Sequence, residues 1–288
     1  MGRILKALIF NQEISVSLLD TTDIVNTAIE YHNLSPLAAA ALGRTLTAGA
    51  FMASNLKNDG DKLSITINGN GEGGQIVVCA DNELHMRGCI ENAQVNLPLN
   101  ASGKLDVAGA VGRRGRISIV KDIGLKEPYT SSCNIISGEL AEDFAAYYTY
   151  SEQQPTGMAL GVKIGKALKC VGAGGIVMQP MPNASEESLQ KAEELLSHFG
   201  NISTMIEEMG LDGIAKAYFD GVKFNELKPI YKCNCSREYV DRILITLGKE
   251  ELLETLEKEG KIEVVCQFCP EKYTYYRQDI DKLLDKND

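Results

Sequence analysis

The sequence has no uninterrupted apolar run long enough to cross a bilayer, which takes about 20 predominantly apolar residues in a helix. Its longest apolar stretch, from Leu37 to Met52, is rich in alanine and contains Arg44. No secretory signal is recognisable either, because Lys6 interrupts the N-terminal segment before an apolar core develops. We therefore expect a cytoplasmic protein with no membrane partner.

Histidine is also scarce, and the three that occur, His32, His85 and His198, lie far apart in the sequence. None has a neighbouring serine or carboxylate in a pattern typical of nucleophilic catalysis. The glycine-rich segment 69–74 matches a dinucleotide-binding pattern, but a predicted strand follows it where such a site needs a helix. We interpret this segment as a hairpin loop, and we expect a protein that is not an enzyme.

Basic side chains are outnumbered, with 29 Lys and Arg against 39 Asp and Glu and a formal net charge of −10. The imbalance is concentrated after residue 179, where 22 of the acidic but only 14 of the basic residues lie. Contacts from basic side chains to phosphate supply most of the non-specific affinity for nucleic acids. The sequence therefore predicts no nucleic-acid partner.

The rest of the composition is that of a globular protein, with 44% hydrophobic residues in a chain of 288. A central helix is expected to begin at Ser35, a typical N-cap, with Pro36 at its first position, and to run towards Leu56. It is apolar nearly all round, which indicates a buried helix within a mixed α/β domain over residues 1–182. Strands are expected at 4–10, 14–19, 63–68, 75–80, 84–90, 116–121, 132–137, 160–171 and 174–179.

The sequence of residues 183–228 predicts short amphipathic helices. The first is expected to begin near Asn183, which forms a capping-box spacing with Glu186, and the second to end at Gly210. A third is expected from Ile214 to Phe219. Their apolar stripe comprises Leu195, Leu196, Phe199, Ile202, Met205, Ile206 and Met209. The pattern fits a hinge-like linker and, equally well, ordinary helices packed on the core.

Four of the eight cysteines form two close pairs, Cys233 with Cys235 and Cys266 with Cys269, separated by 30 residues. In a reducing compartment such a cluster favours a metal site over a disulfide scaffold. Four thiolates can enclose one zinc ion tetrahedrally, as in closed structural sites. We expect one zinc ion in a small C-terminal domain, residues 229–288, with helices at 237–247, 251–259 and 280–284 and strands at 262–265 and 273–275.

This zinc site is expected to be both structural and redox-sensitive. A module of about 60 residues is only marginally stable without a bound metal or a disulfide. Bound zinc contributes about 10–16 kcal/mol of apparent folding free energy. Metal loss should therefore unfold the module. The ligand thiolates can be oxidised to disulfides that no longer bind metal, and we expect Cys266 and Cys269 to close first because a Cys233–Cys235 ring is tight. The other cysteines, Cys79, Cys89, Cys133 and Cys170, are interpreted as packing thiols.

Several separated segments, all in the same order, resemble the heat shock protein 33 kDa family of redox-regulated chaperones over essentially the whole chain. The segments that carry this resemblance, in addition to the two cysteine motifs, are 36–44, 62–63, 69–74, 103–107, 120–122, 137–140, 151–153 and 174–175.

The resemblance implies an α+β protein with an N-terminal α/β core whose β-sheet packs on helices, a metastable helical linker and a small zinc-binding domain. It implies an ATP-independent holdase that is inactive when reduced and zinc-bound. Oxidation would form the disulfides Cys233–Cys235 and Cys266–Cys269, release zinc and unfold the linker. The active form would be a homodimer that binds unfolded or misfolding client proteins through the exposed apolar stripe.

Two other functions remain open from the residues alone. A thiol-disulfide oxidoreductase could use Cys266 and Cys269, although such enzymes place this motif at a helix N-terminus and here strands flank it. A zinc-ribbon binding module would recognise nucleic acid, against which the acidic charge argues. Insulin reduction and nucleic-acid binding, respectively, would identify these two classes.

Overall fold

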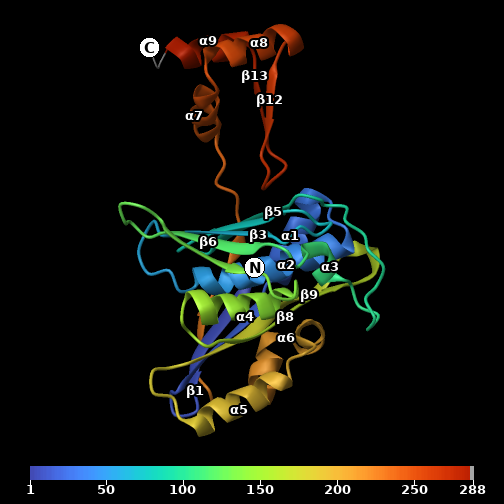
Figure 1. The fold of residues 1–288 in the computed structure, drawn as a ribbon, viewed down its shortest axis with the longest axis vertical. Helices are drawn as coiled ribbons and strands as arrows, with labels where there is room; N and C mark the ends of the chain where they lie inside the picture. Colours follow the sequence, from blue (N-terminus) through green and yellow to red (C-terminus); the bar gives the residue numbers. More distant parts are fainter. Residues whose placement is uncertain (286–288) are drawn as a thin grey trace. The chain divides into compact units, whose positions relative to one another are not determined.

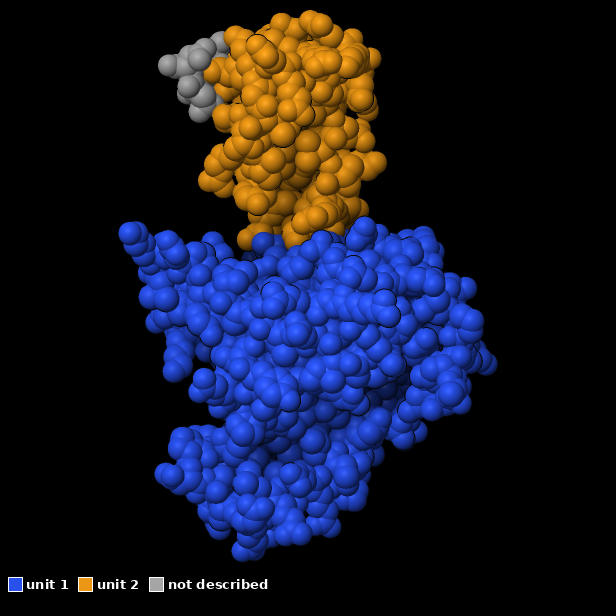
Figure 2. All heavy atoms as spheres, viewed as in Figure 1, with its two compact units in different colours: residues 1–232 blue, residues 233–288 orange. Residues whose placement is uncertain are grey.

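The computed structural model describes residues 1–285 and divides into two compact units, residues 1–232 and 233–288 (Figure 2). Both units mix helices and strands, as the predicted α+β class requires. The segment 183–228 belongs to the first unit, and so do residues 229–232, which we had expected to begin the C-terminal domain. No helix in the described part of the chain combines the length and hydropathy needed to span a membrane.

The first unit is built on two sheets with a layer of helices between them (Figure 1). The five-stranded sheet has the order β10-β1-β2-β9-β8 and the six-stranded sheet the order β11-β5-β4-β3-β6-β7. The strands are β1 (Arg3–Ile9), β2 (Ile14–Asp20), β3 (Lys62–Asn68), β4 (Ile76–Asp81), β5 (His85–Ile90), β6 (Arg116–Asp122), β7 (Tyr129–Asn134), β8 (Gly157–Ile164), β9 (Cys170–Pro180), β10 (Asn225–Leu227) and β11 (Ile230–Tyr231).

The helix between the sheets is α2 (Pro36–Ala53), and it contacts strands of both of them. Its N-cap is Ser35, whose hydroxyl accepts a hydrogen bond from the Ala38 N–H at 3.1 Å, as the sequence predicted. Nearly all of its side chains are buried, because sheets cover it on two sides. Three further helices belong to this unit's core: α1 (Thr22–His32), α3 (Val107–Val111) and α4 (Leu140–Ser151).

The glycine-rich segment 69–74 joins the antiparallel strands β3 and β4, which confirms its interpretation as a hairpin loop. The glycines are needed because α3 approaches the loop backbone closely. A Cβ atom at Gly69 would lie 2.3 Å from the Val111 carbonyl oxygen, and one at Gly71 would lie 2.4 Å from the Ala110 carbonyl oxygen. The loop therefore has a packing role and does not open a helix at which a nucleotide phosphate could bind.

Two strand predictions in this unit were wrong in their bounds. The segment predicted as one strand, 160–171, is instead the end of β8, a short turn η1 (Lys166–Leu168) and the start of β9. The residues of this turn with positive φ are Ala167 and Leu168, at 62° and 57°, and not the glycine or asparagine that usually marks such a position in a sequence. Strand β7 begins three residues before its predicted start and ends at Asn134, where pairing with β6 stops.

Helices α5 (Glu186–Ser197) and α6 (Ile202–Tyr218) cover the outer face of the five-stranded sheet (Figure 1). The N-cap of α5 is Ser185, which accepts from the Ser188 N–H, and not Asn183 as predicted. Gly210 leaves the helical conformation with φ of 63° and ψ of 178°, so α6 is broken where the sequence predicted an end.

The second unit consists of α7 (Arg237–Leu247), α8 (Lys249–Glu259), β12 (Ile262–Val265), β13 (Lys272–Tyr275) and α9 (Arg277–Asp285). The predicted elements are all present, with ends that differ by three residues at most. Its core is small and comprises Val240, Leu244, Leu252, Leu256, Ile262, Tyr275, Ile280 and Leu283.

Candidate metal centre

The four C-terminal cysteines are presented by two local structures of the second unit. Cys233 and Cys235 lie on an extended segment directly before Ser236, the N-cap of α7. Their period-two spacing turns both side chains to one side. Cys266 and Cys269 lie in the turn between β12 and β13, which is closed by a 3.0 Å hydrogen bond from the Cys266 N–H to the Glu271 carbonyl oxygen.

The four sulfur atoms converge on one point. The Sγ atoms of Cys233 and Cys266 are 3.7 Å apart, those of Cys235 and Cys269 are 3.5 Å apart, and all four lie within 4.8 Å of one another. A zinc ion with Zn–S bonds of about 2.3 Å in a tetrahedron requires sulfur atoms about 3.8 Å apart. The cluster therefore has the donor set and the spacing of a closed four-thiolate metal site.

Hydrogen-bond donors surround this cluster. The Phe268 N–H donates to Cys266 Sγ at 3.5 Å, and the Tyr273 hydroxyl donates to Cys235 Sγ at 3.2 Å. The backbone also donates to the other two sulfurs, from residue 235 to Cys233 and from residue 271 to Cys269. Such partners orient metal ligands and stabilise their anionic form.

The thiols of this cluster differ in acidity. Burial raises the pKa of Cys233 to about 11 and also raises the pKa of Cys269 well above its ordinary value. Burial acts on Cys235 too, but hydrogen bonds from Tyr273 and from the other thiols outweigh it and lower the pKa of Cys235. The hydrogen bonds of the site thus favour the anion most clearly at Cys235.

The remaining cysteines, Cys79, Cys89, Cys133 and Cys170, are spread over the first unit. Cys170 is 2% exposed and packs with Val25 and Ala173, and burial raises its pKa to about 11. Cys133 packs against the main core, and burial raises its pKa as well. A buried thiol of raised pKa is a poor nucleophile, which fits the packing role predicted for these two.

The predicted apolar stripe of the linker segment is only partly buried. Phe199, Ile202 and Ile206 are 0%, 1% and 6% exposed, and Leu195, Leu196 and Met205 are half-buried. Met209, the last residue of the predicted stripe, is instead 43% exposed. The break at Gly210 shifts the register of α6, so that the buried stripe continues at Leu211 and Ile214 instead. These two residues and Phe219 were missed by the sequence reasoning.

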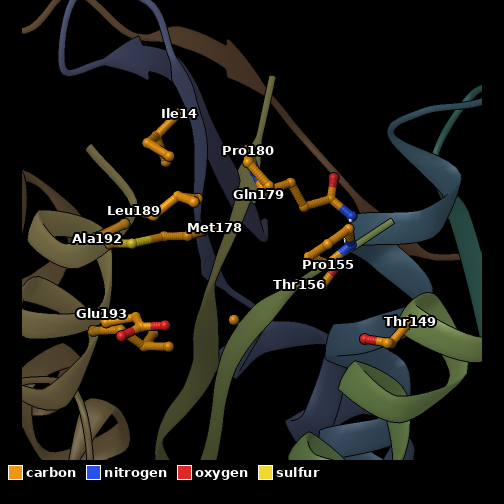
Figure 3. Close-up of a pocket in the computed structure, with 12 residues that line it drawn as sticks. Ile14, Thr149, Pro155, Thr156, Met178, Gln179, Pro180, Leu189, Ala192 and Glu193 are labelled. Atoms are coloured by element: carbon orange, nitrogen blue, oxygen red, sulfur yellow. Dashed lines mark hydrogen bonds between the residues drawn. The ribbon is translucent and has the colours of Figure 1, made fainter. Parts of the chain in front are cut away.

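A cavity of about 420 Å³ lies between α5 and strands β8 and β9 of the first unit (Figure 3). Its walls are mainly apolar, with Met178, Leu189 and Leu196 among them, and the Gln179 amide donates to the Thr156 hydroxyl at 2.9 Å. Glu193 is the one ionisable residue among those that line it. A single carboxylate without a nucleophile or a second titratable group does not form a catalytic constellation.

The position of the C-x-x-C motif bears on the oxidoreductase alternative. Cys266 and Cys269 lie between two antiparallel strands, as predicted, and not at a helix N-terminus where the helix dipole would activate a thiolate. The geometry therefore favours metal binding over thiol-disulfide exchange catalysis.

Comparison with known proteins agrees with this geometry. The sequence model of the family described as Hsp33 protein matches residues 2–276. A 33 kDa chaperonin of Clostridium botulinum (strain Eklund 17B / Type B) is 44% identical over 268 residues, which are 92% of this chain and 91% of that protein. A 33 kDa chaperonin of Clostridium tetani is 41% identical over 286 residues, covering 98% of this chain and 97% of that protein.

A solved structure extends this likeness to the fold. The crystal structure of the 33 kDa chaperonin from Thermotoga maritima superposes with a TM-score of 0.90 and 33% sequence identity, over 99% of this chain and 98% of that one. Sequence, fold and cysteine cluster thus lead to one conclusion: the chain belongs to the Hsp33 family of chaperones.

Proposed function

We propose that this protein is an ATP-independent holdase chaperone that is inactive while its four C-terminal cysteines are reduced and bind one zinc ion, and that oxidation activates it. The observation that carries the proposal is the convergence of four sulfur atoms within 4.8 Å, at the spacing of a tetrahedral thiolate site. Membership of a chaperone family supports the holdase activity.

Cys233, Cys235, Cys266 and Cys269 would hold the zinc ion, which supplies folding free energy to the second unit when bound. Within its described residues that unit has a core of eight buried side chains, so its own apolar burial is small. Oxidation removes the ligands: each pair of thiols gives up two electrons and two protons and forms one S–S bond, while one hydrogen peroxide molecule is reduced to two water molecules.

The disulfide pairing is part of the proposal. The family resemblance implies Cys233–Cys235 and Cys266–Cys269, whereas the tetrahedral cluster also brings Cys233 to Cys266 and Cys235 to Cys269. The within-motif pairs need no long-range contact to persist after the metal leaves, and this favours them once the second unit loosens.

The segment 183–228 is proposed as the linker that responds. Its buried side chains form one apolar cluster with the sheet residues Leu5, Val16 and Met178. Release of α5 and α6 would expose this cluster to unfolding client proteins, and association of two such surfaces would give a homodimer. We place this activity in the cytoplasm, where thiols are kept reduced until oxidants accumulate.

The division into 1–182, 183–228 and 229–288 remains our proposal for the functional parts, with one consequence for experiments. Residues 229–232 contribute to the first unit, because β11 pairs in parallel with β5 and the Gly2 N–H donates to the Pro229 carbonyl oxygen at 3.1 Å. A truncation that removes the zinc module should therefore end at Lys232, and not at Lys228, to leave the first unit intact.

The test compares reduced full-length protein, peroxide-treated protein and a reduced truncation ending at Lys232. Zinc content is measured for each, and light scattering follows the aggregation of a thermally unfolding client. We expect one zinc per reduced full-length chain and none after oxidation, with suppression of aggregation by the oxidised protein and by the reduced truncation but not by the reduced full-length protein. Equal activity of the reduced and oxidised full-length proteins would refute the switch.

A further inference from the structure

The hydroxyl of Tyr273 stands out among the hydrogen-bond donors at the four sulfur atoms. Three sulfurs receive a backbone N–H from the residue two positions further along the chain: Cys233 from residue 235, Cys266 from Phe268 and Cys269 from residue 271. Cys235 instead receives the hydroxyl of a side chain 38 residues away, at 3.2 Å. A backbone donor persists in any sequence, whereas this donor depends on one residue.

The strand β13 fixes the position of this hydroxyl. Tyr273 pairs with Val264 of β12 and packs against the core of the second unit. Two residues further on, and so on the same side of the strand, Tyr275 donates a 2.7 Å hydrogen bond to Asp241 of α7. Both tyrosines thus connect β13 to the chain around the start of α7, one at a sulfur atom and the other at a carboxylate.

A hydrogen bond to a metal-bound thiolate withdraws electron density from the sulfur lone pair that accepts it. That density is what coordinates the metal and what attacks the peroxide oxygen. A donor therefore slows oxidation of its sulfur atom while it orients that atom towards the metal. Loss of an outer partner of this kind typically lowers metal affinity by about 10–100-fold.

We propose that Tyr273 is a positioning residue that holds Cys235 towards the metal and slows its oxidation, so that Cys235 has the protection that backbone donors give the other three sulfur atoms. This inference rests on the proposed zinc-dependent switch and adds to it a residue outside the ligand set.

The test uses the full-length chain with Tyr273→Phe, and Tyr275→Phe as the matched control. The control loses a tyrosine hydroxyl and its hydrogen bond from the same strand, but that hydroxyl bonds to Asp241 and not to sulfur. Zinc affinity is measured by competition with a chromogenic chelator, and the rate of zinc release is measured after addition of peroxide. Alkylation at early times followed by peptide mapping identifies the first disulfide. Cobalt substitution reports the sulfur-to-metal charge-transfer band.

We expect Tyr273→Phe to bind zinc about 10–100-fold more weakly and to release it faster, with Cys235 oxidising earlier relative to the other three sulfur atoms than it does in the wild type. The charge-transfer band should move to lower energy, since a sulfur atom without the donor gives up electron density more readily. Tyr275→Phe should keep the wild-type band and the wild-type order of oxidation.

An unchanged band and order in Tyr273→Phe, or equal changes in both variants, would overturn the assignment to Tyr273. The zinc content of the wild-type chain tests the proposed function separately. If the wild-type chain binds one zinc and Tyr273→Phe changes neither the band nor the order of oxidation, this inference alone is refuted. If the wild-type chain binds no zinc, the switch itself is refuted.

Discussion

Gly172 of β9 lies against Ser203 of α6 so closely that a Cβ atom at Gly172 would be 2.1 Å from the Ser203 carbonyl oxygen. Gly161 of β8 and Gly174 of β9 show the same relationship with α6: added Cβ atoms would lie 3.0 Å and 2.5 Å from side-chain atoms of Ile202 and Ile206. Glycines on the sheet therefore set how closely the helix can approach. They make the contact between α6 and the sheet sensitive to single methyl groups.

The first prediction concerns this contact. Gly172→Ala should push α6 away from the sheet and destabilise the packed arrangement by about 1–3 kcal/mol, the typical effect of overpacking. Hydrogen exchange across residues 202–218 should rise in the reduced protein, and client aggregation should be suppressed with less oxidant. Gly200→Ala is the control, because an added Cβ there meets no atom of the described residues within 4 Å. Unchanged exchange in Gly172→Ala would show that α6 tolerates the displacement.

The second prediction concerns the start of α5. The Glu13 carboxylate accepts hydrogen bonds from the Ser185 N–H at 2.8 Å and from the Ser185 hydroxyl at 2.5 Å, and so connects the β1–β2 hairpin to the N-cap of this helix. Glu13→Ala should therefore increase hydrogen exchange at residues 186–190. Glu127→Ala, which removes an exposed carboxylate outside the helices and strands, should leave that exchange unchanged.

The same contact predicts a pH dependence. The hydrogen bonds from Ser185 lower the pKa of Glu13, so the ionised form is favoured in the folded state. The stabilisation is present above the ordinary pKa of a glutamate and is lost as the pH falls through the lowered value. The difference in exchange between wild type and Glu13→Ala should accordingly disappear in acid. A difference that persists at all pH values would contradict a role for the carboxylate charge.

The third prediction concerns Asp143, a fully buried carboxyl in the first turn of α4. One oxygen accepts from the Ile136 and Ser137 N–H groups at 2.7 and 3.0 Å, and the other has no hydrogen-bond partner among residues 1–285. Burial outweighs these hydrogen bonds and raises the pKa of Asp143. The folded state therefore binds the proton more tightly than the unfolded state, whose aspartate pKa is about 3.9.

The sign of the effect follows from this difference. The unfavourable term from the buried charge is fully present at neutral pH, and it is relieved as the pH falls through the raised pKa. Asp143→Asn should thus be most stabilising relative to wild type at neutral pH, with a difference that shrinks towards about pH 4. Asp143→Ala, which removes the acceptor for both N–H groups, should destabilise by about 1–3 kcal/mol. The measurement is the urea midpoint of wild type and Asp143→Asn from pH 4 to 7.5. A difference between the two midpoints that does not change with pH would contradict this account.

The fourth prediction concerns metal removal. A strong zinc chelator should unfold the second unit, because the eight buried core residues in its described part are too few to replace the metal's contribution of about 10–16 kcal/mol. The first unit has its own large core and should stay folded. Limited proteolysis of the chelator-treated protein should therefore leave a fragment that ends near residue 232, and added zinc should restore resistance. Resistance of residues 233–285 without metal would show that the unit folds unaided.

Features that depend on neighbouring residues could be predicted from the sequence. Ser35 and Pro36 begin α2 and Gly210 interrupts α6, because caps and breaks act within a few positions. The two cysteine motifs meet at one point although 30 residues separate them, and this could be predicted because four thiolates are the complete ligand set of one zinc ion. The elements of the second unit could also be predicted, since short amphipathic helices and a closed turn leave few alternatives.

Features that depend on contacts between distant segments were decided only by the tertiary structure. The strands β10 and β11 have three and two residues and exist because β1 and β5 offer free edges to pair with. Met209 is exposed and Leu211 buried because the break at Gly210 resets the face that α6 turns to the sheet. Tyr273 reaches Cys235 through the register of β13, which no local pattern near Cys235 records. Local signals are carried by the chain itself, whereas these contacts form only when the packing of whole sheets and helices brings remote residues together.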